Sequence, residues 1–246
     1  MILAHDAITF FLNIRPHWRV SAIDAIGHSG GILTAWNPSF GDFQAHITHS
    51  GLLVEVNIKG FSEKMRVLNI YGPYRDMLTF WDQVDSSHIL LLENLFVGGG
   101  LNMTLGPSEV WGGKSLEDSM SLYFRQLFMR ANLVDISLTN LAPTWRNRRA
   151  GAEYIAKRLD RFLVSGALID RVGRYRSWTS HELTFDHLSV NLQVDFQYNR
   201  VHYPFKFNKI WISDGDFKKA VEHYWNGLTT VKTNSNMGTF LHKLTF

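Results

Sequence analysis

The chain has 246 residues, of which 45% are hydrophobic and 19% are charged, and its formal net charge is +3. This length allows one substantial domain, or one domain with an extension, and 17 Phe and 8 Trp can fill a sizeable core. The absence of Cys excludes disulfides and thiolate metal sites. No window approaches the roughly 18 consecutive apolar residues of a membrane span. The small positive charge is compatible with a polyanionic partner but does not by itself indicate one.

Short β-like segments follow one another along the first 196 residues. They cover residues 31–36, 52–58, 64–71, 93–99, 158–165 and 188–196, and the last alternates apolar and polar residues as a half-buried strand does. Helical spacing of apolar residues occurs at 76–84 and 117–133. Because strands dominate and the helices do not alternate strictly with them, the sequence predicts an α+β fold, a sandwich of two sheets with helices outside.

The composition of the sequence changes near residues 196–205, where we place a domain boundary. Residues 197–246 begin as a basic and aromatic linker and continue as an amphipathic run, for which Ser213 or Asp214 is the predicted helix start. The apolar opening at residues 1–18 lacks the features of a secretory signal, so we assign it to the domain that ends at residue 196.

Four short stretches carry the residue types of a reaction site. They are NIYGP (69–73), VGGGLN (97–102), RLDRFLVS (158–165) and TFDHLSV (184–190). The first also fits a plain strand and turn. The glycine run lacks the Lys-Ser/Thr of a P-loop and the spacing of a dinucleotide loop, so we do not expect a cofactor there.

Two of these stretches contain acids that need an explanation. Asp160 interrupts an apolar strand, where an unpaired carboxylate costs several kcal/mol, so it needs a partner, and Arg158 or Arg161 could neutralise it. Asp186 and His187 stand at the mouth of the last strand. Neighbouring residues on a strand face opposite ways, but a strand start can bring both to one rim.

The order of these stretches resembles that of the endonuclease/exonuclease/phosphatase superfamily. That group includes DNase I, the apurinic/apyrimidinic endonucleases and the endonuclease domain of LINE-type non-LTR retrotransposons. The resemblance is closest to plant retroelement sequences and spans roughly residues 20–228. It rests on the four stretches together with SGGILTAWNP (29–38), PTWRNRR (143–149), AKRLDRFLVS (156–165) and PFKFNKIWISDGDFKKAVEHYW (204–225).

The resemblance implies a Mg²⁺-dependent hydrolase of DNA phosphodiesters, with a four-layer α/β/β/α fold. Magnesium prefers hard oxygen ligands, and an imidazolium with an Asp behind it stabilises charge on phosphoryl oxygens. The matching positions are Tyr71 (phosphate contact), Asn102 (nucleophile positioning), Asp160 (partner of the histidine), Asp186 (near the metal) and His187 (phosphate side). Residues 197–246 resemble the connector to a reverse transcriptase, which we expect downstream in the ancestral polyprotein, and a nuclear location follows only from the family.

The sequence departs from the family pattern at three places. Gly100 stands where the family has its catalytic Asp, and Phe185 replaces the usual Ser before Asp-His. The family's first Asn-bearing strand and its Gln-Glu-Thr strand, whose Glu binds the metal, have no counterpart, so we expect an amino-terminally truncated fold lacking its first strands. The expectation is weak or lost Mg²⁺ binding and little or no hydrolytic activity.

Three interpretations of the function follow. The first is an active Mg²⁺-dependent phosphodiesterase with an atypical site. The second is a decayed, non-catalytic domain that still contacts nucleic acid. The third is a phosphoesterase for a small molecule such as an inositol phosphate, against which the retroelement-like tail argues. The candidate nucleic-acid contacts are Arg146, Arg148, Arg149, Lys157 and Arg158, although these side chains also fit a solvated surface.

Overall fold

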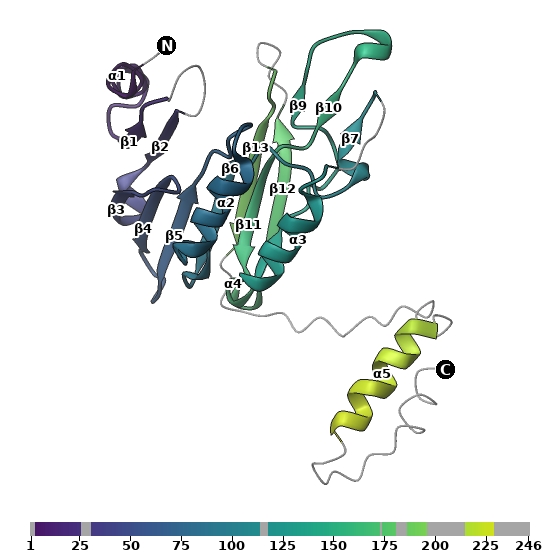
Figure 1. The fold of residues 1–246 in the computed structure, drawn as a ribbon. Coiled ribbons are helices and arrows are strands. Elements are labelled where there is room, and N and C mark those ends of the chain that lie inside the picture. The colour runs from purple at the N-terminus through teal and green to yellow at the C-terminus, as the bar shows by residue number, and fades with distance from the viewer. Residues whose placement is uncertain are drawn as a thin grey trace. The chain divides into compact units, whose positions relative to one another are not determined.

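The computed structural model describes residues 3–25, 31–113, 118–172, 174–180, 186–195 and 215–228. The chain divides into two compact units, residues 1–199 and 200–246 (Figure 1). The predicted boundary near 196–205 and the predicted helix start at Ser213 or Asp214 lie outside the described residues. Within the described part of the chain, no helix is long and apolar enough to cross a membrane.

A six-stranded mixed sheet forms the centre of the first unit, in the order β3-β4-β5-β6-β11-β8. Its strands are β3 (Gly41–Ile47), β4 (Leu52–Ile58), β5 (Lys64–Asn69), β6 (Leu95–Gly100), β8 (Leu133–Asp135) and β11 (Asp160–Ser165). Only the β5–β6 pair is parallel. The central strands β6 and β11 are antiparallel, and Gly100 lies directly opposite Asp160 in their register.

Two helices cover one face of this sheet, α2 (Met77–Ser86) and α3 (Ser121–Arg130) (Figure 1). Trp81 on α2 and Phe124 on α3 are fully buried and meet edge to face, with ring centroids 5.3 Å apart. They pack on strand residues such as Leu68 and Val97, which are also fully buried. This helix-covered face therefore contains the larger core of the domain.

The opposite face carries a second layer made of two separate hairpins. They are β1 (Arg19–Ile23) with β2 (Ile32–Trp36), and β12 (Arg174–Ser180) with β13 (Ser189–Asp195). The β1–β2 hairpin is linked to the main sheet through Asn69, whose Nδ2 donates to Thr34 Oγ1 (2.9 Å). Val56, Phe96 and Val164 of the main sheet form the smaller core under this layer. Within the described residues the two hairpins share no hydrogen-bonded ladder.

Shorter elements complete the first unit. Helix α1 (Ala4–Ile14) contacts the β1–β2 hairpin, and α4 (Gly166–Arg171) buries Leu168 in the smaller core. Strands β7 (Val110–Trp111), β10 (Ala156–Lys157) and β9 (Trp145–Arg146) form a small sheet in that order. The 3-10 turns are η1 (Pro38–Phe40), η2 (Ile89–Leu91), η3 (Pro107–Glu109) and η4 (Gly151–Glu153). The second unit contains the described helix α5 (Gly215–Leu228).

The predicted α+β architecture with several sheets and flanking helices is confirmed. All six predicted strands form, with ends shifted by up to two residues, and the predicted helices appear as α2 and α3. Among the described helices and strands, nine were not predicted, namely α1, α4, β1, β3, β7, β8, β9, β10 and β12. The absence of earlier strands from the fold stays a prediction.

Candidate active site

Asp160 and His187 form the centre of the site. Asp160 opens β11 and His187 lies two residues before the first residue of β13, and His187 Nδ1 lies 2.9 Å from Asp160 Oδ2. This hydrogen bond, together with the negative charge of Asp160 and then of Asp186, raises the pKa of His187 despite partial burial. Because Nδ1 is engaged by the carboxylate, the imidazole keeps Nε2 for another partner. The histidine, not Arg158 or Arg161, is therefore the partner that Asp160 needed.

Thr144 fixes both members of this pair through the backbone. Its side chain is fully buried, and Oγ1 accepts hydrogen bonds from the amides of Leu159 and Asp160, each at 2.9 Å. Its carbonyl oxygen accepts from the amide of Leu188, one residue after His187, at 2.7 Å. One threonine thus holds the start of β11 beside the start of β13.

Gly100 faces the same site from the end of β6. A Cβ built there would lie 3.2 Å from Asp160 Oδ1 and 3.7 Å from Cδ2 of Tyr71. The φ of Gly100 lies outside the left-handed region, so the backbone conformation there is open to L-residues, and the Asp160 carboxylate has to move by only a few tenths of an ångström to admit a Cβ. The position therefore points into the site between Asp160 and Tyr71, but glycine places no chemical group there.

Asn102 lies just beyond β6 in the left-handed conformation, with φ 56°. Its Nδ2 donates to the carbonyl oxygen of Gly72, which ties the segment after Tyr71 to the segment after Gly100. Asn102 is 5% exposed and its Oδ1 has no hydrogen-bond partner among the described residues. A buried acceptor without a partner can be satisfied by a hydrogen-bond donor that a ligand or a water molecule supplies.

A buried network of four charges lies beneath these residues. Arg158 bonds Glu109 and Asp135, each at 2.7 Å, and Arg161 bonds the same two acids at 2.8 and 3.1 Å. Arg158 lies two residues before β11 and Arg161 is its second residue, while Glu109 comes from η3 and Asp135 ends β8. The hydrogen bonds with the arginines hold the pKa of Glu109 below its ordinary value although burial alone would raise it.

This network changes the assignment of Arg158. The side chain is 3% exposed and its guanidinium faces two carboxylates, so it is not available to a nucleic acid. Arg158 therefore leaves the predicted set of contacts and has a structural role. Arg161 also donates to the carbonyl oxygen of Met103 at 3.1 Å, which secures the loop that carries Asn102 against β11.

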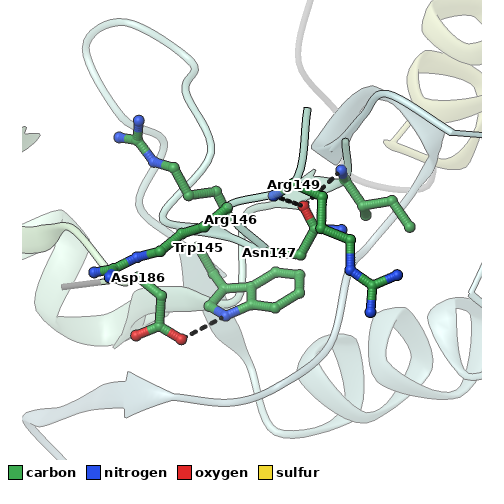
Figure 2. Close-up of a pocket in the computed structure, with 7 residues that line it drawn as sticks. Trp145, Arg146, Asn147, Arg149 and Asp186 are labelled. Atoms are coloured by element: carbon green, nitrogen blue, oxygen red, sulfur yellow. Dashed lines mark hydrogen bonds between the residues drawn. The ribbon is translucent and has the colours of Figure 1, made fainter. Parts of the chain in front are cut away.

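Three of the other candidate contacts, all arginines, line a pocket of about 740 Å³ beside the Asp160–His187 pair. Figure 2 shows five of its lining residues by label, Trp145, Arg146, Asn147, Arg149 and Asp186. Arg148 and Ile155 complete the lining. Lys157 does not line the pocket, but it pairs with Trp145 in the β9–β10 register. The pocket therefore combines three guanidinium groups with one carboxylate and one indole.

The described residues do not fit a magnesium site by themselves. Asp160 is engaged by His187, and Asp186 Oδ2 accepts from Trp145 Nε1 at 3.2 Å. Across the described residues, no three His, Asp or Glu side chains gather in a way that could hold a metal ion. Two acids of the main sheet and its turns are paired elsewhere, Glu55 with Lys64 and Arg66, and Glu63 with Arg171. Magnesium needs several oxygen ligands in near-octahedral geometry, which this set does not supply.

Sequence reasoning missed three residues at the site. Thr144 and Trp145 were noted only as part of a motif, and their roles depend on contacts across the fold. Tyr74, two residues beyond Gly72, is the third: burial raises its pKa, and the nearby Tyr71, Asp160 and Asp186 add to the effect. The second tyrosine of YGPY was the available signal. Phe185 lies outside the described residues.

No protein-family model matches the sequence, and no curated protein matches it. Solved structures do. The endonuclease domain of TRAS1, a telomere-specific non-LTR retrotransposon, is 15% identical over 80% of this chain and 94% of that one, with a TM-score of 0.58. The chain has the DNase I-like fold.

Two further DNase I-like structures show the same likeness. The 3′ phosphatase NExo from Neisseria, bound to a product DNA hairpin, is 16% identical over 79% of this chain and 85% of that one, with a TM-score of 0.57. An AP endonuclease from Archaeoglobus fulgidus is 15% identical over 74% of this chain and 81% of that one, with a TM-score of 0.55. At these identities the likeness establishes the DNase I-like fold, and the chemistry has to be argued from the site.

Proposed function

We propose that this chain is a retroelement-derived DNase I-like domain that contacts nucleic acid and whose ancestral Mg²⁺-dependent hydrolysis of DNA is impaired or lost. The observation that carries the proposal is Gly100. The position opposite Asp160 has the backbone and the orientation for a side chain, and the resemblance expects an aspartate there. Glycine supplies no proton acceptor at that point.

The chemical consequence is a site that keeps its charge-stabilising half and lacks its base. The Asp160–His187 pair still presents an imidazole whose raised pKa favours the cationic form, which suits a phosphoryl oxygen. Loss of a general base alone lowers a rate by roughly 10²–10⁴-fold. The sparse oxygen ligands lower it further, because nothing among the described residues replaces the missing carboxylates.

Contact with nucleic acid is supported by the basic loop beside the site. Arg148 and Arg149 are exposed, and Arg146 is half-buried at the same pocket. The retroelement origin rests on the order of sequence motifs. The TRAS1 domain, described as belonging to a retrotransposon, and NExo, described with bound DNA, are compatible with both parts of the proposal.

Restoring the missing acid tests the proposal. Supercoiled plasmid is incubated with magnesium and with four proteins: the natural chain, Gly100→Asp, Gly100→Asp with an added amino-terminal segment containing the two family strands, and Gly106→Asp with the same segment. Gly106 is the matched control because a Cβ there meets nothing within 4 Å. Nicking is read as conversion of supercoiled to open-circular DNA.

We expect nicking only by the Gly100→Asp protein with the added segment. If the natural chain nicks at a comparable rate, the domain is not impaired. If the Gly106→Asp protein nicks equally well, the added segment restores activity without an aspartate at position 100, and the role assigned to this position is wrong. If no restored protein nicks although each is folded, the proposed ancestral chemistry does not belong to this site.

A further inference from the structure

We propose that the pocket between Trp145 and the 146–149 loop binds an unpaired nucleotide, so that this protein prefers single-stranded to base-paired nucleic acid. The inference rests on the proposed nucleic-acid contact and adds the kind of nucleic acid. It does not depend on hydrolysis.

The pocket has the two chemical features that a nucleotide needs. Arg146, Arg148 and Arg149 contribute guanidinium groups, which bind phosphate oxygens in a bidentate manner. Trp145 contributes an indole, on which any base can stack through its π face. A volume of about 740 Å³ exceeds what a lone phosphate ion fills and lies in the range of small-molecule sites.

The indole is held in place before any ligand binds. Trp145 Nε1 donates to Asp186 Oδ2 at 3.2 Å (Figure 2). The carbonyl oxygen of Asp186 also accepts from the amide of Arg146 at 3.0 Å. The Asp186 carboxylate is thus used to orient the ring. A fixed aromatic platform loses little conformational entropy when a base stacks on it.

The arginine loop is also pre-organised. Asn147 Oδ1 accepts from the amides of Arg149 (3.2 Å) and Ile155 (3.1 Å), and its Nδ2 donates to the carbonyl oxygen of Glu153 (2.8 Å). These bonds close the loop and support the left-handed backbone of Arg148, with φ 55°. Such a conformation in a non-glycine residue persists only when its surroundings hold it.

The combination of indole and phosphate-binding groups in one pocket distinguishes the two forms of nucleic acid. In a duplex, each base is stacked between its neighbours and its faces are covered. Unpaired bases expose their faces and are recognised by stacking on aromatic side chains. A pocket that offered only arginines would bind the backbone of either form, whereas the indole favours the unpaired one.

Binding is measured by fluorescence anisotropy with EDTA present, so that no metal-dependent cleavage occurs. The probes are a labelled single strand of about 12 nucleotides, the blunt duplex of the same sequence, and inorganic phosphate as competitor. The variants are Trp145→Leu, Trp145→Phe and Arg148→Ala/Arg149→Ala. Lys59→Ala/Arg130→Ala removes the same charge from exposed positions on the β4–β5 turn and the end of α3. Thermal unfolding of each variant checks its fold.

We expect the single strand to bind at least about tenfold more tightly than the duplex. Trp145→Leu should weaken single-strand binding by about 5- to 150-fold, the range for loss of one stacked base, and Trp145→Phe should retain most of the affinity. The double arginine variant should reduce the slope of log affinity against log salt concentration by about 1.4, which corresponds to about 0.7 for each lost phosphate contact. The Lys59→Ala/Arg130→Ala control should match the natural chain.

Three outcomes overturn the inference. Equal or tighter binding of the duplex would show that there is no preference for the single strand. An unchanged single-strand affinity in folded Trp145→Leu would show that no base stacks on the indole. Displacement of the single strand by phosphate, at concentrations where sodium chloride of equal ionic strength leaves the complex intact, would mean that the pocket is only an anion site. In each case nucleic-acid contact still stands. Failure to bind either probe contradicts the proposed function itself.

Discussion

At the scale of single residues, the site is organised by a few hydrogen bonds that bring distant segments together. Thr144 is the least conspicuous of these residues in the sequence and one of the most connected in the structure. Its hydroxyl oxygen satisfies the amides of Leu159 and Asp160 in a fully buried position. Removing that oxygen leaves two donors without partners, which is more costly than losing a solvent-exposed hydrogen bond.

We therefore predict that Thr144→Val lowers the free energy of unfolding by about 1–3 kcal/mol or more. The matched control is Thr144→Ser, which keeps the hydroxyl and should change stability much less. Urea denaturation followed by circular dichroism measures both variants. Equal stabilities for valine and serine would show that the hydroxyl does not hold these amides.

The Asp160–His187 pair predicts a pH dependence. Because the pKa of His187 is raised in the folded protein, the pair contributes stability that is complete below the ordinary histidine pKa of about 6.5 and is lost as the pH rises through the folded value. Asp160→Asn should lower the pKa of His187, measured by NMR titration, and should cost more stability at acidic than at alkaline pH. An unchanged pKa would mean that the carboxylate does not act on the imidazole.

At the scale of elements, the buried network of Arg158, Arg161, Glu109 and Asp135 joins η3, β8 and β11. The sequence indicated that Asp160 required a partner and suggested Arg158 or Arg161 for it, but it did not indicate that these arginines pair with Glu109 and Asp135. Their pairing depends on which acids the fold brings to β11, and Glu109 is 52 residues away from Arg161. Such pairings are therefore a product of tertiary structure.

We predict that Glu109→Gln destabilises the domain by about 3–5 kcal/mol, because it leaves two buried guanidinium groups with one carboxylate fewer. Glu153→Gln is the control, since its pair with Arg149 is exposed and should change stability by less than about 1 kcal/mol. The depressed pKa of Glu109 means that its contribution is present above the ordinary glutamate pKa and is lost on acidification. Chemical denaturation at neutral and acidic pH tests both the size and the sign.

The elements themselves were predictable where one kind of periodicity prevailed. Strands β4, β6, β11 and β13 have apolar runs or clean alternation, and the helix periods of α2 and α3 were visible. By contrast, β12 reads RYRSWTS, which is too polar to predict a strand, and it forms by pairing with β13 along its whole length. Helix α1 was read only as an apolar opening, although its apolar residues recur on one face as they do in α2 and α3.

At the scale of the whole molecule, the two faces of the main sheet are covered unequally. The helix-covered face contains fully buried residues such as Trp81 and Phe124, whereas the other face carries two hairpins, each only two strands wide. Isolated hairpins have little stability of their own. The fold class followed from the sequence, but the division of the second layer into two hairpins did not, because it depends on which strands pair.

We predict that amide protons in β1, β2 and β13 exchange with solvent at least about tenfold faster than those in β6 and β11, which pair on both sides within the main sheet. Hydrogen–deuterium exchange with mass spectrometry resolves these segments. Uniform protection across both layers would contradict the unequal coverage and would indicate that the hairpins are stabilised as strongly as the main sheet.

The central claim is that a DNase I-like scaffold with Gly100 opposite Asp160 has lost most of its power to cut DNA. The most direct measurement is the rate at which the natural chain nicks supercoiled plasmid with magnesium, beside an active nuclease of this fold and beside Asp160→Ala. The account predicts a rate lower than that of the active nuclease by roughly 10²–10⁴-fold or more and equal to that of Asp160→Ala. A rate near that of the active nuclease that disappears in Asp160→Ala would contradict it.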